Sequence, residues 1–242
     1  MSAAHTVRIS NPDLTINYFE DLDAAARYAV TDNGTIRPGC LIAMNAEKII
    51  RLRDTPNLFS DCKNVLYYPD GAATLYFAQH KYPRIPGVEL WLKVLARGHA
   101  NGTRICIFGA SEAVSAKAET LLMGRFPKID LTIKHGFFKP EYYDEIISDQ
   151  RPGIVFIAMG TPRQEKMISR MQTLSPQTLF MGVGGSLDVL TGDKKRAPDF
   201  FLNNNLEFVY RLLKEPHRAF RQTALARFLV LYYMNAFKPS ET

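Results

Sequence analysis

Short apolar runs alternate along this chain with segments of helical periodicity. The helical segments cover residues 47–53, 72–80, 88–100, 112–125, 141–148 and 163–174, and the apolar runs cover 40–44, 65–68, 104–108, 129–133, 154–159 and 178–181. Several runs are apolar nearly throughout, as strands covered on both faces are. The alternation predicts an α/β fold whose right-handed crossovers build a mostly parallel sheet flanked by helices.

The two ends of the chain depart from this alternation. The first twenty residues alternate weakly and predict a hairpin, and Asp21 is placed to cap a helix over 22–30. After Pro198 a helical pattern rich in basic residues begins: positions 206–238 hold six Lys or Arg against two acids, which accounts for four of the six net positive charges. We therefore divide the chain into a core, residues 1–198, and a basic amphipathic helical appendage, residues 199–242.

Composition points to an ordinary globular protein, with 242 residues, 46% of them hydrophobic and 22% charged. Its three cysteines, Cys40, Cys62 and Cys106, form no C-x-x-C motif, so we expect buried free thiols in a reducing compartment. The N-terminus lacks an apolar signal core, and the longest late apolar run, 228–234, is far below the ~20 residues that span a bilayer. We expect a cytoplasmic protein, peripheral at the inner face of the cell membrane.

Two polar residues directly follow predicted strands. Asp70 stands between Pro69, which ends a ladder, and Gly71, which permits a tight turn. Open α/β folds bind ligands at the carboxyl ends of their strands, where a carboxylate can act as a general base; a simple turn Asp is an equal alternative. Asn45 follows the run 40–44 in the same way, and it either contacts a sugar or phosphate or caps the next helix.

The sequence Gly160-Thr161-Pro162-Arg163-Gln164-Glu165 follows the apolar run 154–159. Glycine allows close backbone approach and proline suits the first turn of a helix, whose N-terminus is an anion-binding position. Gln164 and Glu165 are then placed to contact uracil or ribose. The alternative is an ordinary strand-to-helix turn in which Glu165 complements the helix dipole.

Two further glycine turns follow predicted strands. The turn 182–186 contains Gly184 and Gly185, but it matches neither the dinucleotide fingerprint nor the Walker A motif. It still allows a ligand to approach the backbone, and Asp188 can hold a ribose hydroxyl or serve as a helix-start carboxylate. Gly109 after the run 104–108 is a weaker example of the same kind.

No metal site is expected. Asp21-Leu22-Asp23 has the D-x-D spacing of metal-dependent glycosyl transfer, but it opens a helix away from the core strands, so capping accounts for it better. The five histidines are scattered. Arginines can instead stabilise a departing pyrophosphate through bidentate contacts, and the candidates are Arg84, Arg211, Arg218 and Arg221. The alternative for the basic tail is a solvated basic face, but its interleaving with apolar residues favours an interfacial helix; these residues are Phe220, Leu225, Phe228, Leu229 and Tyr232.

These motifs, in this order, resemble the WecG/TagA/CpsF family of bacterial glycosyltransferases (family 26). The resemblance runs from about residue 10 to about residue 235 and rests on an ordered set of segments: Asn45-Ala46-Glu47-Lys48, Pro69-Asp70-Gly71, Phe137-Phe138-Lys139-Pro140, Gly160 to Glu165, Gly182 to Gly192, Arg196-Ala197-Pro198, and 206–216. It implies a Rossmann-like core with a C-terminal appendage, and an inverting, metal-independent transfer of N-acetylmannosamine or its uronic acid from UDP to an undecaprenyl-diphosphate-linked amino sugar.

The resemblance also implies roles for individual residues. The family's proposed base falls on Asp70, its active-site asparagine on Asn45 and an arginine on Arg84. Its ligand-contacting glutamine and aspartate fall on Gln164 and Asp188, and its appendage arginines fall on Arg211, Arg218 and Arg221. The segment Asn45-Ala46-Glu47-Lys48 matches the enterobacterial-antigen branch and not the Pro-Asn-Pro-Glu of the teichoic-acid branch, which favours N-acetylmannosaminuronic acid as the donor sugar.

The expected partners are therefore a UDP-sugar, a polyprenyl-diphosphate-linked acceptor and the membrane surface, with no nucleic acid and no cofactor; homo-oligomerisation is left open. Three alternatives remain: a hexosyltransferase of exopolysaccharide assembly, a nucleotide- or nucleic-acid-binding protein and an NAD-dependent oxidoreductase. The second has no DNA- or RNA-binding signature, and the failed glycine fingerprint weakens the third.

Overall fold

The computed structural model describes residues 4–56, 58–194, 198 and 219–241. Its elements run in the order β1 (His5–Ser10), β2 (Asp13–Tyr18), α1 (Leu22–Ala29), β3 (Gly39–Met44), α2 (Ala46–Asp54), β4 (Val65–Pro69), the 3-10 helix η1 (Ala72–Ala78), α3 (Gly87–Ala100), β5 (Ile105–Gly109), α4 (Glu112–Arg125), β6 (Leu131–Lys134), α5 (Pro140–Gln150), β7 (Ile154–Ala158), α6 (Arg163–Leu174), β8 (Leu179–Gly182), α7 (Ser186–Leu190), α10 (Ala219–Tyr233) and β9 (Pro239–Glu241). The predicted strand and helix alternation is confirmed.

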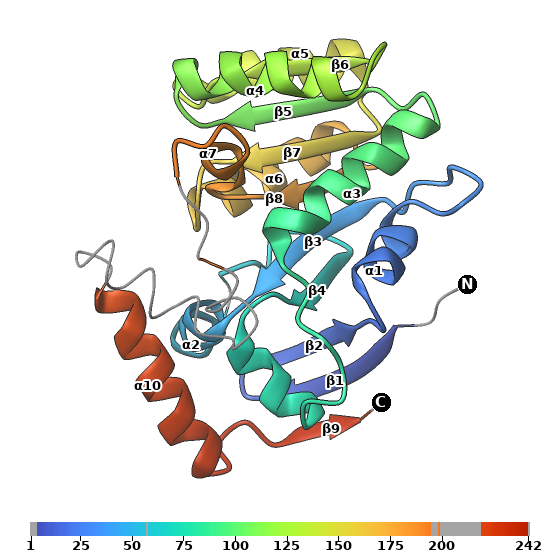
Figure 1. Cartoon of the computed structure of the whole chain (residues 1–242). Coiled ribbons are helices and arrows are strands. Elements are labelled where there is room, and N and C mark those ends of the chain that lie inside the picture. Colours follow the sequence, from blue (N-terminus) through green and yellow to red (C-terminus); the bar gives the residue numbers. More distant parts are fainter. Residues whose placement is uncertain (1–3, 57, 195–197, 199–218, 242) are drawn as a thin grey trace.

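One sheet runs through the molecule in the order β6-β5-β7-β8-β3-β4-β2-β1-β9 (Figure 1). The strands from β6 to β2 pair in parallel, and β1 pairs antiparallel with β2 as the predicted hairpin. Because parallel strands share one direction, the residues that follow β3, β4, β5, β7 and β8 all emerge at the same edge of the sheet. The α/β fold class with a mostly parallel sheet is therefore confirmed.

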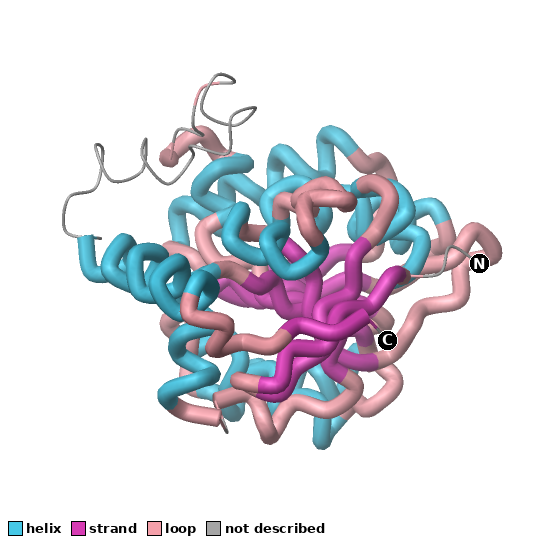
Figure 2. Tube along the Cα trace, turned by 90° about the horizontal axis from the view of Figure 1, so that it is seen from below, coloured by secondary structure: helices cyan, strands magenta, loops and turns pink. Residues whose placement is uncertain are grey.

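Helices cover both faces of the sheet, as Figure 2 shows for the strands seen between two helical layers. On one face, which we call the α2 face, α2, α5, α6 and α10 bury side chains such as Ile49, Ile168 and Phe228. On the opposite face, the α3 face, α1, α3, α4 and α7 bury residues such as Trp91 and Leu187. Strands covered on both sides explain the nearly continuous apolar runs of β5 and β7, all of whose residues are buried.

Local signals set the helix starts. Asp21 caps α1 by accepting the Ala24 N–H at 2.6 Å, so the capping interpretation of Asp21 is confirmed. Ser111 caps α4 in the same manner, with Val114 N as the donor at 3.3 Å. The predicted helix over 72–80 is the 3-10 helix η1, which ends where Gln79 and His80 adopt positive φ angles.

The described C-terminal part, residues 219–241, packs onto the core. Phe228 of α10 and Phe237 after it are buried, and β9 adds a ninth strand by pairing antiparallel with β1. The predicted boundary between the core and the appendage lies after residue 198. Because residues 199–218 lie outside the described residues, this boundary stays a prediction. The prediction of buried free thiols holds for Cys40, Cys62 and Cys106.

Candidate functional site

The carboxyl edge of the sheet collects the strand-end motifs. Asn45 follows β3, Asp70 follows β4 and Gly160 lies just beyond β7, while Gly109 ends β5 and Gly184 follows β8. The helices that follow β3 and β7, α2 and α6, pack on the α2 face, whereas the helices that follow the neighbouring strands β8 and β5, α7 and α4, pack on the α3 face, so the connections diverge at this edge. Such divergence opens the crevice in which open α/β sheets bind ligands.

Asn45 and Asp70 form one corner of this edge. The backbone N–H groups of Asp70 and Gly71 both donate to Met44 O, at 3.1 and 2.9 Å. A Cβ on Gly71 would lie 2.6 Å from the Cβ of Asn45, so only glycine lets the two turns approach this closely. The structure therefore brings together two residues that the sequence separates by 25 positions.

The Asn45 side chain caps α2 in this corner. Its Oδ1 accepts the Lys48 N–H at 3.0 Å, which confirms the capping interpretation. Its Nδ2 donates to no protein acceptor among the described residues. Capping and ligand contact are thus compatible, because each uses a different atom of the amide.

The Asp70 carboxylate is oriented by the start of α3. Its Oδ1 accepts the Gly87 N–H at 2.9 Å, and Asp70 is only partly exposed. The Ile85 N–H donates to Pro69 O at 2.7 Å, so the segment that carries Arg84 returns to the end of β4. The structure thus groups Asp70, Asn45 and the neighbourhood of Arg84 at the ends of β3 and β4.

A buried ion pair links this corner to the next strands. Lys48 Nζ of α2 lies 2.9 Å from Glu165 Oε1 of α6, and the two side chains are 8% and 3% exposed. The same Oε1 accepts hydrogen bonds from Thr161 Oγ1 at 2.9 Å and Gln164 Nε2 at 3.0 Å. Burial raises the pKa of Glu165, but the Lys48 charge and these donors outweigh it and hold the pKa below its ordinary value.

Gln164 continues the network to the glycine turn after β8. Its Oε1 accepts the Gly184 N–H at 3.1 Å, and a Cβ on Gly182 would lie 2.5 Å from its Nε2. The side chains of Gln164 and Glu165 therefore bond to the protein and hold the turns after β7 and β8 together. Both had been predicted to contact a ligand. One atom is left over: within the described residues, the buried Glu165 Oε2 has no hydrogen-bond partner. The ligand contact stays a prediction.

The remaining glycines fall into two groups. A Cβ on Gly109, whose φ is 136°, would lie 2.4 Å from Ala158 O, so this glycine lets the ends of β5 and β7 meet. Gly160 and Gly184 have φ angles of 74° and 52°, and apart from their chain neighbours no heavy atom of the described residues would lie within 4 Å of a Cβ on either. Gly185 borders Asp188, which pairs with Lys194 at 3.2 Å. Close packing therefore explains Gly109, whereas the left-handed backbone explains Gly160 and Gly184 and leaves open space above them.

The appendage arginines are described only in part. Arg211 and Arg218 lie outside the described residues, and so does the side chain of Arg221, although its backbone belongs to α10. Arg227 of the same helix forms a bidentate pair with Asp54 of α2, at 2.5 and 2.8 Å. The distance of these predicted arginines from the strand-end corner therefore stays a prediction.

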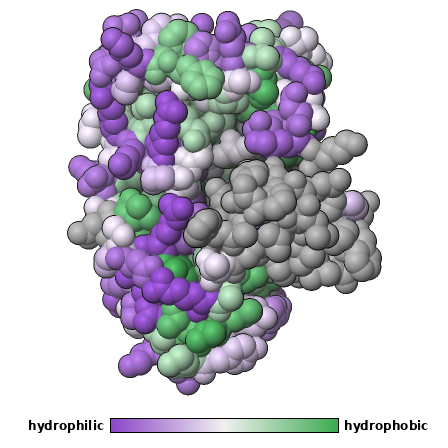
Figure 3. Space-filling model, turned by 90° about the vertical axis from the view of Figure 1, so that its left-hand side faces the viewer, coloured by the Kyte–Doolittle hydropathy of each residue, from purple (hydrophilic) through white to green (hydrophobic). Residues whose placement is uncertain are grey.

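The apolar side of α10 faces the protein and not the solvent. Four of the residues that suggested an interfacial helix pack on the core of the α2 face, namely Leu225, Phe228, Leu229 and Tyr232. The large apolar residues that α10 and its end expose are different ones, Val230, Tyr233 and Met234. Figure 3 views this side of the molecule and shows apolar residues gathered in its lower part.

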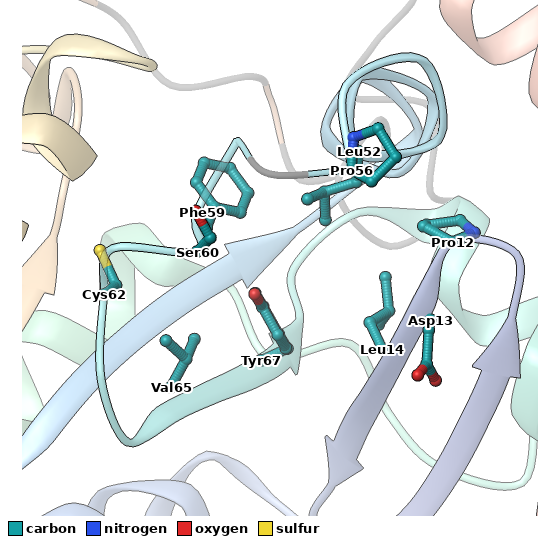
Figure 4. Close-up of a pocket in the computed structure, with 10 residues that line it drawn as sticks. All are labelled: Pro12, Asp13, Leu14, Leu52, Pro56, Phe59, Ser60, Cys62, Val65 and Tyr67. Carbon is teal, nitrogen blue, oxygen red and sulfur yellow. The ribbon is translucent and has the colours of Figure 1, made fainter.

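A cavity of about 360 Å³ lies at the opposite edge of the sheet (Figure 4). Val65, the first residue of β4, and Leu14, near the start of β2, line it together with Phe59 and Cys62. None of the predicted site residues whose side chains the structure describes borders it. It is therefore separate from the strand-end corner.

Within residues 4–194 and the other described positions, no three His, Cys, Asp or Glu side chains come together as a metal site. The absence of a metal from the reaction nevertheless stays a prediction. Among the described helices, none is long and apolar enough to cross a bilayer.

A mostly parallel α/β sheet with a carboxylate, an amide and glycine turns at its carboxyl edge is the arrangement in which open α/β folds bind their ligands. The family model described as "Glycosyl transferase WecG/TagA/CpsF family" matches residues 8–242. The chain belongs to this family. It is a glycosyltransferase, and it acts on a sugar donor and an acceptor.

Lys48 and Thr161 belong to the site although the sequence did not single them out. Lys48 stands in one of the segments that carried the resemblance, and Thr161 stands in the Gly160 turn. Neither was predicted to contact a ligand. The ion pair joins positions 117 residues apart, and no spacing rule reveals it. The helix periodicity places Lys48 on the buried side of α2, and a buried lysine is almost always paired with an acid. This was the signal by which the sequence could have indicated the ion pair.

Proposed function

We propose that this glycosyltransferase moves N-acetylmannosaminuronic acid, or N-acetylmannosamine, from its UDP-sugar to an undecaprenyl-diphosphate-linked amino sugar in cell-surface polysaccharide synthesis. The observation that carries the proposal is the corner in which Asp70 is oriented by the Gly87 N–H and its neighbour Gly71 lies against Asn45. A fixed carboxylate beside an amide suits the activation and orientation of a sugar hydroxyl.

In the proposed step, Asp70 takes the proton of the acceptor hydroxyl as its oxygen attacks the anomeric carbon of the donor. The bond from that carbon to the UDP oxygen breaks, and UDP leaves with the electron pair. Attack from the side opposite UDP inverts the anomeric centre. No metal is required if arginines neutralise the pyrophosphate, and we assign this role to Arg84 and to the appendage residues Arg211, Arg218 and Arg221.

The donor nucleotide is assigned to the glycine turns after β7 and β8. Backbone N–H groups near Gly160, Gly184 and Gly185 can approach phosphate oxygens closely. Glu165 Oε2, buried without a partner among the described residues, is the atom through which this carboxylate would contact the nucleotide. Asp188 is assigned to a ribose hydroxyl.

Because a polyprenyl acceptor is confined to the bilayer, we place the enzyme at the inner face of the cell membrane. Val230, Tyr233 and Met234, which are exposed and belong to the basic appendage, support this placement, since apolar and cationic groups together favour binding to an anionic lipid surface.

The direct test measures turnover with purified undecaprenyl-diphosphate-linked N-acetylglucosamine and a panel of UDP-sugars. We expect UDP-N-acetylmannosaminuronic acid to give the highest kcat/KM, N-acetylmannosamine to follow, and a metal chelator to leave the rate unchanged. Preference for UDP-glucose would assign the enzyme to exopolysaccharide assembly. Binding of UDP without transfer to any lipid-linked acceptor would reject the proposed acceptor class.

Substitutions of Asn45 separate its two roles. Asn45→Ala removes the cap and is expected to lower the free energy of unfolding by about 1 kcal/mol. Asn45→Ser keeps an acceptor for the Lys48 N–H but loses the Nδ2 donor, so we expect near-normal stability with reduced kcat/KM. Urea unfolding and initial-rate kinetics on both variants check this. Full activity of Asn45→Ser would leave Asn45 with the capping role alone.

A further inference from the structure

The hydroxyl of Tyr68 is buried without a partner. Tyr68 is 0% exposed, and within the described residues its Oη forms no hydrogen bond. Two other fully buried tyrosines do bond: Tyr18 Oη donates to Thr74 O and Tyr143 Oη to His135 O, both at 2.6 Å. An unsatisfied buried hydroxyl destabilises the fold, and phenylalanine would fill the same space without that cost. The hydroxyl therefore calls for an explanation outside folding.

Its position supplies that explanation. Tyr68 lies in β4, with its side chain buried on the α3 face of the sheet, and Asp70 follows it by two residues, directly after the strand ends. A Cβ on Gly87 would lie 2.9 Å from Tyr68 Oη, and the N–H of the same Gly87 donates to Asp70 Oδ1 at 2.9 Å. The hydroxyl thus lies beside Gly87, whose N–H is a donor to the carboxylate.

The hydroxyl is a proton donor under all ordinary conditions. Burial raises the pKa of Tyr68 well above its usual value, and the charge of Asp70 raises it further. No substrate reaches a side chain that is 0% exposed. Any effect of this hydroxyl on the reaction must therefore pass through a neighbour, and Asp70, directly after the same strand, is a carboxylate close enough to act on it electrostatically.

We propose that Tyr68 is a positioning residue for Asp70, whose hydroxyl serves the carboxylate as a second donor beside the Gly87 N–H when the acceptor is bound. Because the hydroxyl has no bond to a described residue, a bond to the carboxylate would replace no existing one. Two donors together direct the carboxylate towards the acceptor hydroxyl. The proposal rests on Asp70 being the base.

Tyr68→Phe tests it in the full-length enzyme. We expect kcat to fall about 10- to 100-fold, the factor that one hydrogen bond to a charged group represents. The KM for the UDP-sugar should stay within about twofold, and the melting temperature should be unchanged or higher, because an unsatisfied hydroxyl is removed. If Tyr68 had a purely structural role, a fall in kcat would be accompanied by a lower melting temperature.

Tyr18→Phe is the matched control. It removes the hydroxyl of another buried tyrosine, one that is bonded to Thr74 O, and it should lower the melting temperature while kcat is retained. Wild-type kcat in Tyr68→Phe would overturn the positioning role, and so would an equal loss of kcat in both tyrosine variants. Asp70→Asn distinguishes the failures: if it is inactive while Tyr68→Phe is fully active, only the role of Tyr68 fails, whereas an active Asp70→Asn rejects the base itself.

Discussion

Asp70→Asn is expected to lower kcat by about 10²- to 10⁴-fold, the usual contribution of a general base. The amide has the size of the carboxylate and keeps an oxygen for the Gly87 N–H, which donates to Asp70 Oδ1 at 2.9 Å. The substitution therefore removes proton-accepting ability while the corner at the ends of β3 and β4 is retained. Affinity for UDP, measured by calorimetry, should change little because the nucleotide is assigned to the turns after β7 and β8.

A matched Asp→Asn change elsewhere provides the control. Asp130 forms a surface ion pair with Arg104 at 2.9 Å, and such exposed pairs contribute between about 0 and 1 kcal/mol to stability. Asp130→Asn should keep full turnover. Turnover of Asp70→Asn within about twofold of wild type would remove Asp70 as the base, whereas loss of UDP binding in the same variant would show that the corner itself had rearranged.

Strand ends are the part of this site that sequence reasoning reaches. An apolar run that stops at Pro69, or at Asn45 before a helical segment, marks a carboxyl end, and in a parallel sheet all such ends meet at one edge. The prediction of a helix over 163–174 is confirmed without change. Pro162 marks where this helix begins, and the periodic spacing of its apolar residues marks the face that is buried. Residues 45, 70, 160 and 184 follow from local signals of this kind.

Pairings between distant segments escape the same reasoning. β9 contains only Pro239, Ser240 and Glu241, none of which favours a strand, and its pairing with β1 joins Val7 to Glu241. The apolar residues of α10 suggested a membrane surface, yet four of them cover the α2 face. An apolar stripe on a helix indicates that this face is buried. Whether protein or lipid covers the face depends on the tertiary fold.

Glu165→Gln and Lys48→Met are each expected to lower the free energy of unfolding by about 3–5 kcal/mol. The two charged groups are 2.9 Å apart and almost fully buried, and removal of one partner leaves the other charge uncompensated in the interior. The loss is large for a single domain because total stabilities are about 5–15 kcal/mol. Urea unfolding followed by circular dichroism measures it.

The double variant Lys48→Met, Glu165→Met tests whether the single variants lose stability because of an uncompensated charge or because of lost packing. If the uncompensated charge causes the loss, the double variant should be more stable than either single one, since two apolar side chains of similar volume can replace a buried pair. Losses that add in the double variant would contradict this. Activity should not recover with stability, because Glu165 Oε1 also holds Thr161 and Gln164 beside the Gly184 turn.

The pH dependence of stability follows from the same pair. The pKa of Glu165 is lower in the folded protein than its ordinary value of 4.5, so folding favours the carboxylate form. Its contribution to stability is therefore complete above pH 4.5 and is lost as the pH falls through the folded-state value. Wild type should lose more stability than Glu165→Gln over this acid range. Parallel pH profiles for the two proteins would show that Glu165 does not contribute through its charge.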